Sequence, residues 1–237
     1  MRANDRIQEV ETWLDRLYIA ADGASLRVED RRKAAEVTAI LEEIERAVKR
    51  FSRRRSLVLV DAAAGKSYVG LLAAQLVFGP LGLDARVLVL EKNQRLVALS
   101  RTAAELLETR TPVECLAADV SDPSCWPEEP DIVVALHACG PASDVIIERA
   151  IACRARLLLL VPCCTSDAVA AVRLAKEEAV RLAIPDQAPV RRRFIQAMVD
   201  AERTRRLEAA GYVTEVVEFV GATVTPHNLL WRARRGK

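Results

Sequence analysis

Short apolar runs alternate with amphipathic stretches through the middle of the chain, and this alternation limits the folds open to it. The runs are rich in valine and leucine, and most are followed by a stretch in which apolar residues recur at helical spacing. Continuous apolar strands separated by helices are typical of a parallel sheet that is buried on both faces. Right-handed crossovers then give a doubly wound, Rossmann-like α/β fold. The runs are Leu57–Val60, Arg86–Leu90, Val113–Ala118, Ile132–Leu136 and Leu157–Val161.

Two amphipathic stretches precede the first run, at residues 5–20 and 29–52. In each stretch the apolar residues share one face at a spacing of three or four residues, which predicts helices. We expect these helices to pack as an N-terminal helical cap over residues 1–55, followed by an α/β domain over residues 56–237. Their pattern is amphipathic rather than basic, so packing is their expected role.

The last part of the chain is expected to complete the sheet. A helix is predicted over residues 190–210, and two strands are predicted over Tyr212–Val220 and Ala222–Trp231, joined by a turn at Gly221. A closing antiparallel pair brings the predicted sheet to seven strands. Residues 184–190 contain prolines and are the best candidate for a loop or lid in the second half of the chain.

The composition supports a folded domain without a membrane segment. Of the 237 residues, 51% are apolar, which is enough for a sizeable core. No apolar run approaches the roughly 20 residues that span a bilayer, and the charged N-terminus lacks the apolar centre of a signal peptide. We therefore expect a cytoplasmic protein with no membrane partner, in which the six cysteines are reduced rather than paired.

The net charge is only +2, but the basic residues are gathered in clusters. Such clusters can contact phosphate backbones, although solvated helix faces and a frayed tail explain them equally well. Both interpretations stay open at this point. The clusters are Arg31–Lys33, Lys49–Arg55, Arg191–Arg193, Arg203–Arg206 and Arg232–Lys237.

The residues that end the predicted strands are the candidates for a site, because ligands of doubly wound folds bind beyond the carboxyl ends of the strands. An apolar strand has little structural reason to end so often in an ionisable or thiol group. Any one of these residues alone is weak evidence, because strand ends also meet solvent. They are Asp61, Glu91, Asp119, His137 and the pair Cys163–Cys164.

The loop after the first strand, Asp61–Lys66, is built from small residues. Small residues let the backbone approach a ligand closely, and the N-terminus of the following helix offers free N–H groups. Gly65 and Lys66 also match the end of a phosphate-binding P-loop, but that motif requires glycine where this chain has Val60. The loop is therefore interpreted as a cofactor wall rather than as a P-loop.

Glu91 and Asp119 suit a bound nucleoside. A carboxylate at the end of the second strand can accept hydrogen bonds from both ribose hydroxyls, and one at the end of the third strand can accept a hydrogen bond from an adenine amino group. A nicotinamide dinucleotide fits Glu91 equally well, but the glycine-poor first loop argues against the pyrophosphate of that cofactor. A solvated loop carboxylate or a turn cap is the alternative interpretation of Asp119.

The order of these three carboxylates, each at a strand end, resembles the class I S-adenosylmethionine-dependent methyltransferases. Further motifs resemble one branch of that superfamily, which contains the tRNA acceptor-stem 2′-O-methyltransferase and related methyltransferase-like proteins. The resemblance covers roughly residues 56–165, although the branch usually carries more glycine where this chain has Ala62–Ala64. The motifs are His137-Ala138-Cys139-Gly140 followed by Ser143-Asp144, Pro162-Cys163-Cys164, and a looser match at Thr225-Pro226-His227-Asn228.

The resemblance implies a methyltransferase that uses S-adenosyl-L-methionine. RNA is the favoured acceptor and partner, and a small molecule or a protein stays open as the acceptor. The residues expected to contact the cofactor are Asp61, Ala63, Gly65, Glu91, Asp119 and His137.

A hydroxyl acceptor requires a base that takes its proton. The catalytic candidates, in order of preference, are His137, Asp144 and Lys66. Because the fourth and fifth strands are expected to be neighbours, the thiols that follow them should lie close to His137. A zinc site and buried structural thiols are the alternatives, and no metal ligand is assigned because the spacing matches no zinc ribbon or finger. The expected substrate pocket contains Cys139, Cys163, Cys164, His227 and Asn228.

Two other functions remain open from the sequence. Glu91 is compatible with an NAD-dependent oxidoreductase. The alanine-rich first loop and the basic clusters are compatible with a non-catalytic RNA-binding protein on a methyltransferase scaffold.

Overall fold

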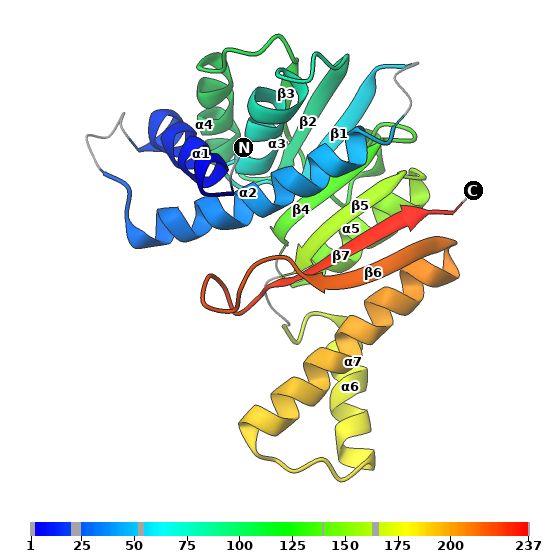
Figure 1. Cartoon of the computed structure of the whole chain (residues 1–237). Helices are drawn as coiled ribbons and strands as arrows, with labels where there is room; N and C mark the ends of the chain where they lie inside the picture. The colour runs from blue at the N-terminus through cyan, green and yellow to red at the C-terminus, as the bar shows by residue number, and fades with distance from the viewer. Residues whose placement is uncertain (1–2, 20–24, 52–54, 139, 163–165, 237) are drawn as a thin grey trace.

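The computed structural model describes residues 3–19, 25–51, 55–138, 140–162 and 166–236 (Figure 1). Its centre is a seven-stranded sheet with the strand order β3-β2-β1-β4-β5-β7-β6. The strands β1 to β5 pair in parallel, and β7 pairs antiparallel with both β5 and β6. The strands are β1 (Leu57–Ala62), β2 (Ala85–Glu91), β3 (Val113–Ala117), β4 (Ile132–Ala138), β5 (Leu157–Pro162), β6 (Tyr212–Glu218) and β7 (Leu229–Arg235).

The sequence prediction of a doubly wound, Rossmann-like seven-stranded sheet with N-terminal helices is confirmed. The helix α3 continues into a π-helical turn, η2, and a short 3-10 turn, η3, follows β3. The helices and turns are α1 (Ala3–Tyr18), α2 (Val28–Val48), α3 (Tyr68–Ala73), η2 (Ala74–Phe78), α4 (Gln94–Glu105), η3 (Pro123–Cys125), α5 (Pro141–Ala152), α6 (Ala170–Arg181) and α7 (Ala188–Ala209).

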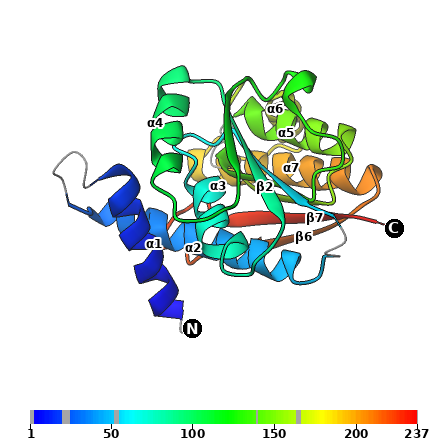
Figure 2. The same cartoon turned by 90° about the horizontal axis from the view of Figure 1, so that it is seen from above.

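Alternate residues of the strands face two separate apolar clusters. In β1, Leu57 and Leu59 pack with α1, α2 and α3 on one face, whereas Val60 packs with α5 and α7 on the other. Figure 2 shows α2 and α5 on opposite sides of the strands. Burial on both faces explains why the central strands β1 and β5 are almost continuously apolar in sequence.

The N-terminal helices share the first of these clusters with the sheet. Val10 and Leu14 of α1 and Ile40 and Ile44 of α2 are buried in it. Burial of this stripe is what holds the two helices, because isolated helices of this length are marginal in water. The division into a cap over residues 1–55 and a domain over residues 56–237 stays a prediction.

The predicted position of the last strand is wrong. The structure begins β7 at Leu229 rather than at residue 222, and residues 219–228 connect it to β6. Pro226 lies within the predicted strand, and proline cannot donate to the hydrogen-bond ladder of a strand that is paired on both sides, as β7 is. Side chains hold the connection instead: the Thr225 hydroxyl accepts a hydrogen bond from the His227 amide, and the Asn228 amide group donates to the Val220 carbonyl.

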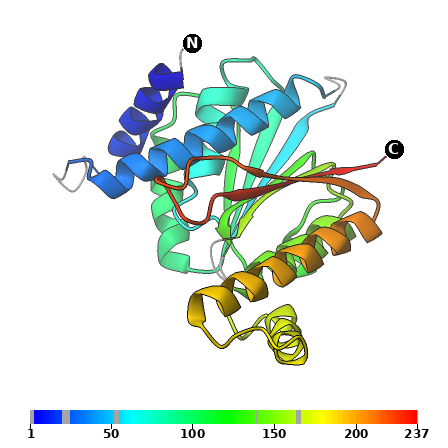
Figure 3. The same ribbon diagram turned by 60° about the horizontal axis from the view of Figure 1, so that its bottom comes forward.

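The predicted loop at residues 184–190 is shorter in the structure. Its last residues are the first turn of α7, which begins at Ala188. Pro189 is compatible with this position, because a first-turn N–H has no partner within the helix. The remainder lies at the tip of the α6–α7 hairpin, which projects from the sheet (Figure 3). Among the described residues, no helix combines the length and the hydropathy needed to cross a bilayer.

Candidate functional site

Asp61 lies within β1 and is only 2% exposed. Its Oδ2 atom accepts a hydrogen bond from the amide of Gly70, 2.8 Å away in α3. Burial, with a smaller contribution from the nearby Glu91 charge, raises the pKa of Asp61 to about 7 against the lowering effect of the Gly70 hydrogen bond. These contacts tie the strand to the helix that follows it. A role for Asp61 in cofactor binding stays a prediction.

Glu91 ends β2 and organises the loop that follows β1. Its Oε2 atom accepts a hydrogen bond from the Gly65 amide at 2.9 Å, and its Oε1 atom accepts one from the Asn93 amide at 2.8 Å. Gly65 and Ala63 both have positive φ angles, 59° and 53°, so the loop turns sharply at the strand end. Each carboxylate oxygen has a second lone pair, which leaves Glu91 able to accept further hydrogen bonds from a ligand.

A cavity of about 290 Å³ opens at this edge of the sheet. Three of the predicted cofactor residues line it together, namely Ala63 after β1, Glu91 at the end of β2 and Asp119 after β3. The wall is completed by Lys92, Ala118, Val120, Pro141, Ala142 and Val145, the last three from the first turns of α5. The cavity therefore combines two carboxylates with an apolar wall, which suits a polar sugar and a flat ring.

Asp119 is exposed at the rim of this cavity. Its Oδ1 atom accepts a hydrogen bond from the Ser121 amide at 2.9 Å, and the hydrogen bonds from Ser121 hold its pKa below the usual value. Asp119 is therefore ionised at neutral pH. Asp122, three residues later, caps Ser124 in the same way but does not line the cavity.

His137 lies near the end of β4 with a positive φ of 64°, at a shift in register between β4 and β5. Backbone strain of this kind in a non-glycine residue costs about 1–3 kcal/mol and is concentrated at functional sites. The His137 Nε2 atom lies 2.9 Å from Oε2 of Glu36, a buried residue of α2. The Lys33 ammonium group lies 2.6 Å from the same carboxylate oxygen. Glu36 thus connects the N-terminal helix to the central strand.

Glu36 is ionised in this position. Burial acts to raise its pKa, but the hydrogen bonds and charges of His137 and Lys33 outweigh the effect of burial and lower it. Glu36 was not among the residues predicted from the sequence. The sequence signal that could have indicated Glu36 is its place one turn before Ile40, on the apolar face of α2. An unpaired carboxylate there would be energetically costly. Its partner, 101 positions further along the chain, is not visible in the sequence.

The other two catalytic candidates have different surroundings. Asp144 of α5 accepts hydrogen bonds from Arg203, at 3.3 Å, and from Arg206, at 3.1 Å, so it ties α5 to α7. Lys66 accepts a hydrogen bond from the Tyr18 hydroxyl at its carbonyl, and its ammonium group lies 5.4 Å from the centroid of the Tyr18 ring. The catalytic roles of Asp144 and Lys66 stay predictions.

A second cavity, of about 240 Å³, lies beyond the end of β5. His227 and Asn228 line it, as the substrate-pocket prediction requires, together with Pro162. Asn228 also holds the β6–β7 connection through its bond to the Val220 carbonyl, 3.0 Å away. The role of these residues in acceptor binding stays a prediction. Cys139, Cys163 and Cys164 lie outside the described residues.

Three residues of α7 that were not predicted for the substrate pocket, Gln196, Asp200 and Arg203, also line this second cavity. Burial raises the pKa of Asp200 to about 6, against the lowering effect of the Arg203 charge. Gln196, Asp200 and Arg203 are spaced by four and three residues, which places them on one face of the helix. This spacing is the sequence signal that could have grouped them. Among the described residues, no group of three or more histidine, cysteine, aspartate or glutamate side chains could hold a metal ion.

Comparison with known proteins gives partial matches in sequence and broad matches in fold. Two curated relatives, the glutathione S-transferase C-terminal domain-containing proteins of Homo sapiens and Macaca fascicularis, are each 31% identical over 119 residues. The match covers 41% of this chain, and the chain spans about a fifth (19%) of the length of those relatives.

Among solved structures, magnesium protoporphyrin IX methyltransferase from Synechocystis PCC 6803, with bound SAH, matches with a TM-score of 0.53 and 13% identity over 97% of this chain and 99% of its own. The CurJ carbon methyltransferase matches with a TM-score of 0.54 and 11% identity over 95% of this chain and 61% of its own. At these identities the likeness shows the fold.

A family model described as a methyltransferase domain matches residues 32–170. The matched segment runs from α2 into the start of α6, and it contains Glu36, the cavity at Glu91 and Asp119, and His137. The match covers more than half of the chain, and the chain therefore belongs to this family of methyltransferase domains.

Proposed function

We propose that the chain is an S-adenosylmethionine-dependent methyltransferase that binds its cofactor in the cavity at the ends of β1, β2 and β3. The observation that carries this proposal is that Ala63, Glu91 and Asp119, from three separate strand ends, line one cavity. The Glu91 carboxylate accepts hydrogen bonds from the ribose hydroxyls, and the Asp119 carboxylate accepts one from the adenine amino group. Val120 and Ala142 supply the apolar wall for the adenine ring.

The family and the fold support this choice of cofactor. The chain belongs to a family of methyltransferase domains, and the Synechocystis enzyme of the same fold was solved with SAH and with SAM bound. Membership of a methyltransferase family favours this function over an NAD-dependent oxidoreductase, which shares only the need for a carboxylate at Glu91.

His137 is proposed as the general base for a hydroxyl acceptor. S-adenosylmethionine supplies a methyl group on an electrophilic sulfonium, so the chain has mainly to align the acceptor and remove its proton. When Nε2 of His137 carries the proton and donates to Glu36, the ring lone pair is on Nδ1, which is the form that accepts a proton. The Glu36 carboxylate then stabilises the imidazolium that results. Glu36 is thus a positioning residue for His137.

RNA is proposed as the acceptor class, with a small molecule and a protein as alternatives. The basic clusters of the sequence support RNA. Labelled methyl transfer into separate RNA, protein and small-molecule fractions from cells that lack the protein tests this choice. Label in the RNA fraction supports RNA as the acceptor. Label in the protein or small-molecule fraction instead identifies that class as the acceptor. If no fraction is labelled although the cofactor binds, the chain is a non-catalytic protein on a methyltransferase scaffold.

Cofactor binding is tested by isothermal titration with S-adenosylhomocysteine. Asp119→Asn is expected to weaken binding by roughly tenfold, because a hydrogen bond to a charged group contributes about 1.5–3 kcal/mol. Asp122→Asn is a matched control, since both aspartates are exposed and both cap a serine amide at 2.9 Å, but only Asp119 lines the cavity. The proposal would be reversed if the folded wild-type protein did not bind S-adenosylhomocysteine and NADH quenched its fluorescence instead.

A further inference from the structure

The tertiary structure brings together two basic clusters that are far apart in the sequence. Arg46 and Arg50, near the end of α2, face Arg232 and Arg234 of β7 across a cavity of about 240 Å³. The rest of the wall is Glu43, Ala47, Leu157, Leu159 and Glu215. We call this cavity, which the four arginines line, the arginine cavity. It is separate from both cavities described above.

The fold builds this cavity in a regular way. Arg232 and Arg234 are two positions apart in β7, so both project from the same face of the sheet, beside their β5 partners Leu159 and Leu157. Helix α2 crosses that face with residues 43, 46 and 47 on one side of the helix, and Arg50 follows two residues after the helix ends at Val48. Figure 1 shows that the C-terminal ends of α2 and β7 lie toward the same end of the molecule.

The cavity carries more positive than negative charge. Glu43 is shared, because it pairs both with Arg46 and with Arg232. Glu215 lies 3.6 Å from Arg232. Arg50 and Arg234 are exposed, and no carboxylate of the described residues lies within ion-pair distance of either. Two guanidinium groups at the mouth of the cavity are therefore available to an anion.

The excess of positive charge continues beside the cavity. Arg55 and Arg156 share a single carboxylate, that of Asp131, at 2.9 and 3.8 Å, and Arg156 directly precedes Leu157 of the cavity wall. A surface in which two cations share one anion suits an extended polyanion rather than a single phosphate ion.

The position of the cavity also favours a polymer. Helix α2 contacts His137 through Glu36 and lines the cavity with Arg46. Ten residues of helix separate Glu36 from Arg46, or roughly 15 Å at a rise of 1.5 Å per residue, and Arg50 lies beyond the end of the helix at Val48. A small acceptor at His137 does not extend that far. We infer that the arginine cavity binds backbone phosphates of an RNA whose reacting nucleotide lies at His137.

Guanidinium groups suit this task because they pair with phosphate oxygens through two parallel hydrogen bonds. The inference rests on the proposed function only for the location of the reacting nucleotide. Binding of RNA to the cavity does not require cofactor or methyl transfer, so its failure is distinguishable from failure of the proposed methyltransferase activity.

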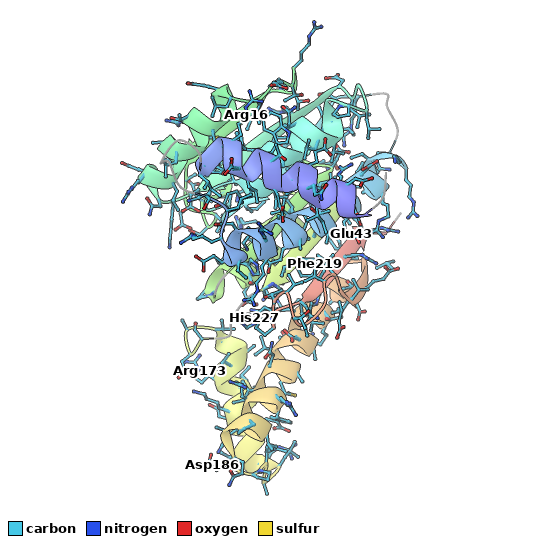
Figure 4. All side chains as sticks on the ribbon, turned by 60° about the vertical axis from the view of Figure 1, so that its left-hand side comes forward. Arg16, Glu43, Arg173, Asp186, Phe219 and His227 are labelled. Atoms are coloured by element: carbon cyan, nitrogen blue, oxygen red, sulfur yellow. The ribbon has the colours of Figure 1, made fainter. Side chains whose placement is uncertain are left out.

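The test uses the full chain and a fluorescently labelled structured RNA, such as bulk tRNA, with fluorescence anisotropy as the readout. The test variant is Arg50→Glu/Arg234→Glu. The matched control is Arg173→Glu/Arg192→Glu, which makes the same change of charge at exposed arginines on the α6–α7 hairpin. In Figure 4, Arg173 lies on this hairpin, well separated from Glu43 of α2. Affinity for S-adenosylhomocysteine is measured on both variants and is expected to equal that of the wild type.

The cavity variant is expected to bind RNA at least tenfold more weakly than the control variant near 0.1 M salt. For the cavity variant, the slope of log affinity against log salt concentration is expected to be shallower by about 0.7–0.9 for each phosphate that the variant no longer neutralises. Equal losses of affinity in the two variants, or no RNA binding by the wild type, overturn the inference. Cavity-dependent binding of polyglutamate that is as tight as that of RNA would assign the surface to an acidic protein instead.

Discussion

The carboxylate of Glu36 and the imidazole of His137 meet at 2.9 Å, although 101 positions separate them in the chain. The contact joins the N-terminal helix α2 to the end of the central strand β4. Glu36 is buried and ionised, so it offers His137 a fixed negative charge rather than a solvated side chain. The first helices therefore contribute to the candidate site as well as to the core.

Glu36→Gln is expected to lower kcat by roughly one to two orders of magnitude, part of the 10²–10⁴ that general acid–base catalysis contributes. The amide keeps the shape of the side chain but loses the charge that stabilises the imidazolium. The KM for the acceptor and the affinity for S-adenosylhomocysteine are expected to change little. Steady-state kinetics and isothermal titration measure the two effects separately.

Glu42→Gln is the control for this variant, because Glu42 is an exposed glutamate of the same helix. The ring nitrogens of the two histidines in the chain give an independent readout by ¹⁵N NMR, with His227→Gln as the assignment variant. The His137 signals are expected to shift in Glu36→Gln and to stay in place in Glu42→Gln. Identical kinetics and spectra in the two glutamine variants would show that Glu36 does not act on His137.

Asp61 makes the stability of the folded state depend on pH. Its folded pKa of about 7 lies above the unfolded value near 3.8, so between these values the folded state binds more protons than the unfolded state. Stability therefore falls as pH rises through this window, by roughly 4 kcal/mol if the shift is taken in full. Asp61→Asn removes this contribution, and the variant is expected to lose less stability than the wild type between pH 4.5 and 7.5.

Urea denaturation of both proteins at the two pH values measures this difference. Asp200, whose pKa is also raised, to about 6, contributes in the same direction in both proteins and cancels in the comparison. If the wild type and Asp61→Asn show the same change with pH, Asp61 is ionised in the folded state across this range.

Asp144→Ala is expected to destabilise the protein by about 3 kcal/mol, because the buried guanidinium group of Arg203 loses the nearer of its two carboxylate partners. Arg203 is 1% exposed, and Asp200 at 3.6 Å is then its remaining carboxylate partner among the described residues. Glu148→Ala, on the same helix, is the control, since Glu148 is exposed and pairs only with Arg206, at 3.1 Å, among the residues that the structure describes. Its expected cost is below about 1 kcal/mol.

Thermal or urea unfolding of these two variants measures the cost, and kinetics of the folded fraction measures activity. An Asp144→Ala protein with wild-type stability but a greatly reduced kcat would support the catalytic role that the sequence suggested for Asp144.

The sequence by itself determined the sheet and the edge at which the cavity lined by Ala63, Glu91 and Asp119 lies. Apolar runs that alternate with helices are a local pattern, and a parallel sheet brings the carboxyl ends of its strands to one edge wherever such a pattern occurs. Glu91 and Asp119 were found in this way, and both line the same cavity. The start of β7 was missed, because its limit depends on side-chain bonds made by Thr225 and Asn228 within the connection.

Only the tertiary structure decided what each charged side chain faces. Asp61 accepts a hydrogen bond from a backbone amide of α3. Asp144 accepts hydrogen bonds from two arginines of α7, and Glu36 lies within hydrogen-bond distance of the histidine of β4. The arginine cavity likewise needs α2 to cross β7. A sequence pattern reports which face of a helix or strand a residue occupies. The partner that balances a buried charge comes from another part of the chain, and only packing brings the two together.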